Sequence, residues 1–370
     1  MASPRFQLLT HDGPLDIVRQ KKCAAHWSHG FTVDKWLACE QLLRQRSSFQ
    51  QPGAYTPCAL VQGDDVVASC EIYRMTGVVR TASGLQEGAL YGIASVFTPD
   101  AHRRKGYAAL LLRSVRQHLE QVHTDGALPC LGTLLMCEAA QALYESVGYV
   151  ATPCSCPPMD WEFYATEPGF EMHTRCKLLT EGDVPTIAAV LGDRVRAALT
   201  DAEPGSIAVA SSASQLEWHR LREEARRRTS NAPPAPESCG AVCGRSIILW
   251  AIDDADHMAA AEGDEQSRRT VLRVLIFLPC DAGRTDDDAA VLAAAVQVAQ
   301  QADCTVVMWD TDGLARQPSS AKWAPPEEEL ALMGVGARYV DRDCGSIPML
   351  NAQFGGSAQR WSFIPRAVWM

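Results

Sequence analysis

The sequence lacks a long hydrophobic run. No uninterrupted apolar segment approaches the roughly 20 residues that a membrane-spanning helix needs. The first residues, MASPRFQLLTHDGP, also lack the charged and apolar regions of a signal peptide. We therefore expect no membrane partner and a cytoplasmic location.

Positive charge is scarce as well. The chain has 34 lysine and arginine residues against 44 aspartate and glutamate residues, a formal net charge of −10 at pH 7. This balance provides no basic surface for nucleic acid, so no nucleic-acid partner is expected. A cationic substrate is favoured instead, because an acidic protein attracts it.

Regular cysteine spacing is also absent. The 14 cysteines are scattered and do not form the dense pattern of a small secreted scaffold. Cys239 and Cys243 have the spacing nearest to that of a metal site, but no second pair of Cys or His follows at zinc-site spacing. We expect free thiols and no metal.

The sequence does contain enough apolar residues for two globular cores. It has 370 residues, of which 47% are hydrophobic, and this length exceeds what one core usually organises. A Pro- and Cys-rich stretch over 151–175 is typical of a connection. We expect a catalytic domain over 1–165 and a second domain over 166–370, in a monomer or homodimer.

The first half has the pattern of several strands followed by alternating helices and strands. The predicted elements are a helix within 28–50, strands over 55–60, 66–74 and 90–97, a helix with Leu111, Leu112, Val115 and Leu119 on one face, a strand over 131–137, a helix over 139–147 and a strand at 149–150.

The second half repeats this order of elements. The predicted elements are helices over 181–199, 214–228, 286–302 and 327–333, strands over 246–252, 270–278, 304–309, 347–351 and 361–368 and near Val340, and loops over 231–240 and 253–266. We therefore expect a degenerate duplicate of the first fold.

The most informative stretch is Ala94–Leu112 (ASVFTPDAHRRKGYAALLL), where an apolar strand leads into a basic, glycine-containing turn and then an amphipathic helix. The N–H groups and dipole at a helix N-terminus favour a phosphate group. Gly106 and Ala108 allow the backbone to approach it closely, and Arg103, Arg104 and Lys105 add positive charge. The stretch predicts a phosphate site.

Two motifs here resemble a known family. Arg103-x-x-Gly106-x-Ala108 is similar to the pyrophosphate loop of the GNAT acetyltransferases, and Leu143–Tyr149 (LYESVGY) is similar to their second acetyl-CoA motif. A closer resemblance, to the fungal lysine N-acetyltransferases, rests on Ala68–Glu71, Gly92–Phe97 and Arg104–Ala108. It rests less securely on Trp218-His219 with Arg222–Glu224.

The resemblance implies the fold and the cosubstrate. The fold class is α/β, a GNAT fold with a mixed, strongly twisted sheet flanked by helices, followed by a second, degenerate GNAT-like domain. The cosubstrate is acetyl-CoA, and no metal is implied. The implied cofactor-binding residues are Ser95, Val96, Phe97, Thr98, Arg103, Arg104, Lys105, Gly106, Tyr107 and Ala108.

Two residues receive catalytic roles. A lysine side chain, with an ordinary pKa of about 10.4, must lose a proton before it attacks a thioester. Glu71 is the candidate base and substrate ligand, or else an ordinary strand carboxylate facing solvent. Tyr144 occupies the motif position of the acid that protonates the departing thiolate, or else it simply packs on a helix face.

Other residues have two interpretations each. Trp218 and His219 either contribute to a substrate pocket from the second domain or pack a helix. Cys70 and Cys137 lie near the predicted active-site strands, but neither has an obvious local His base, so a covalent acyl-enzyme is disfavoured.

The predicted function is acetyl transfer from acetyl-CoA to a small primary amine, with the side-chain amine of free L-lysine as first choice. Alternatives are another amino acid, a polyamine or a protein lysine as acceptor, or a non-catalytic acyl-CoA-binding module. The second domain is acidic after Pro279, where the phosphate loop should be basic. We expect it to bind no coenzyme A and to cover the substrate side of the first domain.

Overall fold

A computed structural model of the chain describes most of its length. The described residues are 3–28, 31–46, 53–123, 128–137, 141–151, 159–166, 175–230, 236–253, 271–279, 285–309, 327–341, 347–351 and 360–363. Parts of the loops expected over 231–240 and 253–266, of the connection over 151–175 and of the stretch after Pro279 lie outside them.

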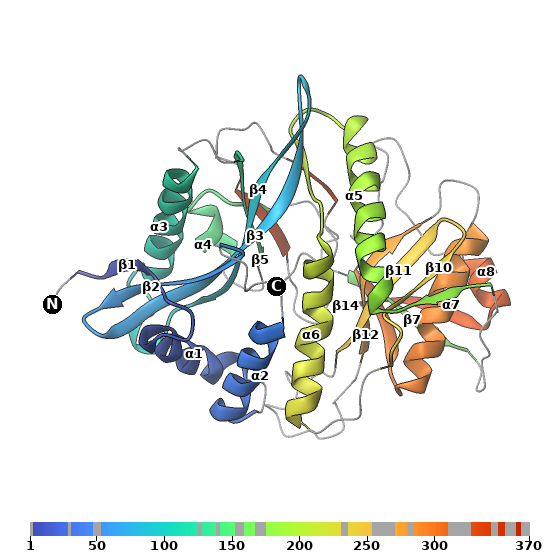
Figure 1. The fold of residues 1–370 in the computed structure, drawn as a ribbon, viewed down its shortest axis with the longest axis horizontal. Helices are drawn as coiled ribbons and strands as arrows, with labels where there is room; N and C mark the ends of the chain where they lie inside the picture. Colours follow the sequence, from blue (N-terminus) through green and yellow to red (C-terminus); the bar gives the residue numbers. More distant parts are fainter. Residues whose placement is uncertain are drawn as a thin grey trace.

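The described chain contains both helices and strands (Figure 1). The α-helices are α1 Pro14–Trp27, α2 Val33–Arg46, α3 Tyr107–Val122, α4 Gln141–Glu145, α5 Val184–Thr200, α6 Ala213–Ser230, α7 Thr285–Gln301 and α8 Glu327–Leu332. None of them, within the described ranges, is long and apolar enough to cross a membrane.

The strands form two mixed sheets. Those of the first half are β1 Arg5–Leu8, β2 Tyr55–Gln62, β3 Asp65–Thr81, β4 Gly84–Phe97, β5 Cys130–Cys137, β6 Val150–Ala151 and β7 Met159–Ala165. Those of the second half are β8 Lys177–Leu179, β9 Ser206–Val209, β10 Gly240–Cys243, β11 Ser246–Asp253, β12 Val271–Leu278, β13 Thr305–Trp309, β14 Val335–Asp341, β15 Ile347–Asn351 and β16 Arg360–Phe363.

The two sheets share one topology. The first runs β1-β2-β3-β4-β5-β15-β6, with β9 beside β3 and β16 beside β9, and the second runs β14-β7-β13-β12-β11-β10-β8. In the first sheet β3 and β4 are antiparallel while β4 and β5 are parallel. The second sheet repeats this, with β11 and β12 antiparallel and β12 and β13 parallel. The mixed α/β fold and its degenerate repeat in the second half are therefore confirmed.

Each sheet also receives a strand from the other half of the chain. β15, near the C-terminus, lies between β5 and β6 of the first sheet. β7, inside the stretch expected to be a connection, lies between β13 and β14 of the second sheet. The division into 1–165 and 166–370 stays a prediction about domains, but the sheets do not follow it.

Apolar helix faces hold the layers together. The predicted face of α3 is correct, because Leu111, Leu112, Val115 and Leu119 are all buried in the core of the first sheet. Helix α5 fills the space between the two sheets, packing with residues of β9 and β11 in one cluster (Figure 1). Helix α7 contributes an alanine- and valine-rich face to the core of the second sheet.

The prediction missed several elements and shortened two others. It contained none of β1, α1, β7, β8, β9 and β10, and it ended β3 at Arg74 and began β4 at Leu90. The observed strands continue into a long hairpin, which pairs as far as Thr81 and Gly84. Part of the reason is nonlocal, since β9 pairs with the distal part of β3 at Gly77–Val79.

Because β15 is inserted between β5 and β6, the first sheet should depend on a residue close to the C-terminus. Met349 is fully buried in the same core as α3. We expect Met349→Ala to lower the free energy of unfolding by about 2–5 kcal/mol, the usual cost of truncating a buried methionine. Urea unfolding checks this, with Leu332→Ala, whose side chain is 85% exposed, as the control. Equal stability of the two variants would contradict the insertion.

Candidate active site

A bulge at the end of β4 organises the site. In the β3–β4 ladder Ser69 pairs with Phe97 whereas Glu71 pairs with Ala94, so β4 contains one extra residue there. Ser95 has a φ of 51°, a left-handed conformation that is uncommon for residues other than glycine. Bulges of this kind re-aim a side chain, and here the Ser95 hydroxyl is directed at Glu71.

The same end of β4 separates from β5. Their parallel pairing ends at Gly92 and Leu134, although β4 continues to Phe97 and β5 to Cys137. Among the described strands, none pairs with the β5-facing edge of β4 after this point. The two diverging strands thus leave backbone groups that can bind an extended, amide-containing ligand.

Glu71 is the centre of the polar network beside the bulge. Its Oε1 accepts hydrogen bonds from Arg19 Nη1 (2.9 Å) and the Tyr55 hydroxyl (2.9 Å). Its Oε2 accepts from the Tyr73 hydroxyl (3.0 Å) and Ser95 Oγ (2.8 Å). Glu71 is only 7% exposed, so the alternative of a solvent-facing strand carboxylate is wrong.

This environment fixes the charge of Glu71. Burial by itself would raise the pKa of the carboxyl, but the charges of Arg19 and Arg44 and the hydrogen bonds from Ser95 and Tyr55 lower it to about 2. Burial and the Glu71 charge raise the pKa of Tyr55 well above its ordinary value, so its phenol stays protonated as a donor. Glu71 is therefore ionised at neutral pH, and hydrogen bonds from protein side chains take the place of water around its carboxylate.

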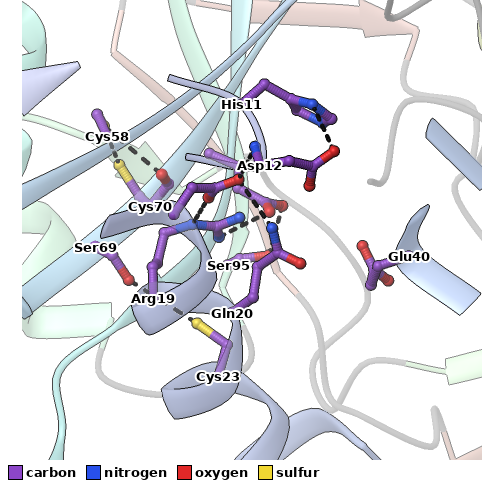
Figure 2. Close-up of polar contacts among 12 residues, drawn as sticks. His11, Asp12, Arg19, Gln20, Cys23, Glu40, Cys58, Ser69, Cys70 and Ser95 are labelled. Atoms are coloured by element: carbon purple, nitrogen blue, oxygen red, sulfur yellow. Dashed lines mark hydrogen bonds and ion pairs between the residues drawn. The ribbon is translucent and has the colours of Figure 1, made fainter. Parts of the chain in front are cut away.

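Helix α1 provides the opposite charge, and sequence reasoning missed it. Arg19 is 1% exposed and also donates from Nε to Asp16 Oδ1 (2.7 Å) and from Nη2 to the Tyr55 hydroxyl (3.2 Å). Asp16 is fully buried and accepts from Gln20 Nε2 (2.8 Å). Figure 2 shows part of this network around the Arg19 and Gln20 side chains of α1.

Helix α2 adds a second arginine and a second carboxylate. Arg44 Nη2 lies 3.5 Å from Glu40 Oε2 and 4.0 Å from Glu71 Oε1. Thr32 precedes this helix, and its Oγ1 accepts from the Lys35 N–H at 3.4 Å. Sequence reasoning predicted the helix but gave neither Glu40 nor Arg44 a role.

The predicted phosphate loop has the expected geometry. Gly106 caps α3 with φ 77°, and Arg104 before it also has a positive φ, 60°. A Cβ placed on Gly106 would meet open space, so only backbone conformation requires glycine there. The loop is exposed, and Arg103 and Lys105 fold back on it, donating to the carbonyls of Thr98 (3.1 Å) and Ala101 (2.8 Å). Basic side chains thus flank the first N–H groups of α3, and the phosphate site there stays a prediction.

The remaining cofactor candidates follow this loop and strand. Thr98, at the end of β4, has a buried Oγ1 without a hydrogen-bond partner in the described part of the protein. Val96 and Tyr107 pack partly buried against the first-sheet core. Ala108, in the first turn of α3, is half-buried.

Tyr144 lies in α4 and is partly buried against the first-sheet core. Its ring meets that of Tyr149 edge-on at 6.0 Å. The Tyr149 hydroxyl accepts from Thr133 Oγ1 (2.9 Å) on β5, so the pair is anchored to that strand. The neighbouring residues 138–140 lie outside the described part of the chain.

The second half reaches the site through α6. Trp218 and His219 are both buried, and Trp218 packs in a cluster with Cys39 and Leu43 of α2. The Trp218 ring also lies edge-on to the ring of Tyr73, which donates a hydrogen bond to Glu71, with 6.3 Å between the ring centroids. Both interpretations of these residues stay open, and Trp218 contacts the Glu71 network through Tyr73.

The cysteines near the strands are poorly suited to nucleophilic catalysis. Cys70 is fully buried, and its Sγ lies 3.2 Å from that of Cys58 on β2. The hydrogen bond with Cys58 and, to a smaller extent, burial raise the pKa of the Cys70 thiol well above its ordinary value. As for metal binding, no cluster of three metal-ligating side chains occurs among the described residues.

The second sheet has carboxylates where the first has its predicted phosphate loop. Helix α7 follows β12 as α3 follows β4, and its first turn contains Asp286, Asp287 and Asp288. Ser246 donates to Asp288, and Arg175 Nη2 donates to Asp287 Oδ1 at 3.1 Å. These side chains put negative charge at this helix N-terminus, which disfavours a bound phosphate.

The buried anion makes a testable contribution to stability. Glu71→Gln removes one of the two carboxylates paired with the buried Arg19 and leaves Asp16 as the other, so we expect the free energy of unfolding at pH 7 to fall by about 3–5 kcal/mol. The pKa of Glu71 is lowered on folding, so this stabilisation is present above its ordinary value of 4.5 and disappears as pH falls toward about 2.

Urea unfolding of both proteins at a series of pH values checks this. The difference between them should be constant above about pH 4.5 and shrink below it. Glu87→Gln is the control, because Glu87 forms an exposed ion pair with Arg196 (2.8 Å) and should change stability by less than about 1 kcal/mol. A difference that does not depend on pH would contradict the buried ion pair.

Comparisons with known proteins agree with this geometry. The acetyltransferase (GNAT) family matches residues 23–149, and the LYC1 GNAT-like C-terminal domain matches residues 160–366. No curated protein sequence matches the chain significantly.

Two solved structures show the same fold. A GCN5-related N-acetyltransferase from Kribbella flavida is 16% identical, with a TM-score of 0.50 over 94% of this chain and 71% of that one. A probable N-acyltransferase from Enterococcus faecalis V583 is 10% identical, with a TM-score of 0.52 over 94% of this chain and 72% of that one. The match to the LYC1 GNAT-like C-terminal domain, over residues 160–366, covers more than half of the sequence. The chain therefore belongs to the family with a LYC1 GNAT-like C-terminal domain and is an acyltransferase of the GNAT superfamily.

Proposed function

We propose that the protein transfers an acetyl group from acetyl-CoA to the side-chain amine of free L-lysine, by direct attack within a ternary complex. The observation that carries this proposal is the continuity of two features. The bulge at Ser95 is followed, after one short loop, by the left-handed Gly106 that begins α3. One segment thus offers a backbone edge for a pantetheine arm and a helix N-terminus for a pyrophosphate.

The residues present fit the cosubstrate. The basic loop at Arg103–Gly106 suits the pyrophosphate, and the β5-facing edge of Ala94–Phe97 suits the amide groups of pantetheine. The buried, unpartnered Oγ1 of Thr98 lies between these two regions of the chain. When bound, acetyl-CoA supplies the activated acetyl group, and the remaining chemistry belongs to the protein.

We assign Tyr144 as the proton donor to the departing thiolate. Its place in the second motif and the anchoring of its ring against Tyr149 support this role. Glu71 holds the bulge through Ser95. The base role predicted for Glu71 stays a hypothesis, and its low pKa and four donors weigh against it.

A small acceptor is favoured over a protein. The contact of Trp218 of α6 with Tyr73 and the packing of α6 on α2 support a role for the second half of the chain in covering the substrate side. A protein lysine would need an open groove there. A free amino acid requires only a closed site.

A thiol-release assay with acetyl-CoA tests the proposal. The acceptors are L-lysine, N-α-acetyl-lysine, spermidine and a lysine-rich peptide. We expect rapid turnover with free L-lysine and a side-chain acetyl product by mass. If only another amine is acetylated, that amine and not lysine is the acceptor. Tight acetyl-CoA binding without turnover of any amine would favour an acyl-CoA-binding module.

Tyr144→Phe separates catalysis from binding in the same assay. Loss of the hydroxyl should lower kcat about 100-fold, the usual effect of removing a general acid, with acetyl-CoA affinity retained. Tyr164→Phe, on β7 of the second sheet, is the matched control.

A further inference from the structure

We propose that Glu40 of α2 accepts the proton that the acceptor amine must lose. This inference rests on the proposed function, because it identifies the proton acceptor for that reaction. It begins from the state of Glu71, whose two oxygens already accept four hydrogen bonds. A carboxylate in this state would have to give up a donor before it could take a proton.

Glu40 is a neighbouring carboxylate whose oxygens accept fewer hydrogen bonds than those of Glu71. Arg44 Nη2 contacts both Glu40 Oε2 (3.5 Å) and Glu71 Oε1 (4.0 Å), so the two carboxylates share one guanidinium nitrogen. Within the described residues Arg44 is the one ion-pair partner of Glu40. In Figure 2, Glu40 lies apart from the hydrogen-bonded network around Arg19 and Ser95 and comes from a different helix.

Glu40 is also accessible. Its side chain is 24% exposed, whereas those of Arg19 and Asp16 are 1% or less and that of Glu71 is 10%. An ammonium group arriving from solvent can therefore reach Glu40 before it reaches the enclosed part of the network. The carboxylate attracts the ammonium group before it takes its proton.

The electrostatic surroundings suit this role. Burial raises the pKa of Glu40 above its ordinary value, and the negative charge of Glu71 adds to that effect. Three cations face it and act in the opposite direction, namely Arg44 on its own helix, Arg19 on α1 and Arg226 on α6. A carboxylate with a raised pKa is a better proton acceptor near neutral pH.

The step is balanced as follows. The ammonium group gives one proton to Glu40, leaving a neutral amine and a neutral carboxyl. The amine lone pair forms the N–C bond to the thioester carbonyl, the C–S bond breaks, and sulfur keeps the electron pair. Tyr144 gives its proton to the thiolate and regains the second proton lost by nitrogen. Glu40 then releases its proton to solvent, so each turnover liberates one H⁺.

The pH dependence of kcat/KM tests the role. In the wild-type protein Glu40 deprotonates bound ammonium, so kcat/KM for L-lysine should be nearly level over about pH 7–9. In Glu40→Gln only the minor neutral amine reacts, so kcat/KM should rise about tenfold per pH unit toward the amine pKa of about 10.4. At pH 7 the loss should be about 100-fold.

Two controls separate catalysis from folding. Asp34→Asn alters an exposed carboxylate on the same helix and should keep the level profile. Glu40→Asp should restore part of the activity and the level profile, because a carboxylate is present again. An acceptor amine of lower pKa should rescue Glu40→Gln, since more of it is already neutral.

The outcomes are distinguishable. If the wild-type protein acetylates no amine, the proposed function fails, and with it the role of Glu40. If the wild-type protein is active and Glu40→Gln keeps its activity and level profile, only the role of Glu40 is overturned. If the profile becomes steep in Glu71→Gln but not in Glu40→Gln, Glu71 is the base instead.

Discussion

The buried ion pair between Glu71 and Arg19 is the constraint on which the site depends. Burying either charge alone would cost several kcal/mol, so each requires the other and the phenols and hydroxyl around them. The pair joins α1 to the central strand β3, and through Ser95 it holds the bulge that separates β4 from β5. The same contacts keep Glu71 ionised, and Glu40, which shares Arg44 with it, is the more exposed of these two carboxylates.

The sequence was sufficient where the signal is local. The apolar face of α3 and the glycine that begins it could be predicted because helix periodicity and left-handed backbone are both encoded within a few residues. The repeated order of strands and helices in the second half was predictable for the same reason. Its missing phosphate loop was also visible, as aspartates where α7 begins.

The sequence was insufficient where the buried face of a helix is polar and where a strand pairs with a distant part of the chain. The inward face of α1 contains Asp16, Arg19 and Gln20, so the polar residues are buried and hydrophobic periodicity cannot find this helix. The positions of β7 and β15 depend on partners far along the chain. The isolation of Glu71 from solvent follows from these packings, so its burial could not be foreseen from its strand alone.

A crystal structure of the protein with bound coenzyme A tests the central claim most directly. The account predicts one molecule, with its pyrophosphate on the backbone N–H groups at the start of α3 and its pantetheine arm along Ala94–Phe97. The sulfur should point toward the bulge at Ser95. A pyrophosphate bound at the N-terminus of α7, or a pantetheine arm that avoids the gap between β4 and β5, would contradict it.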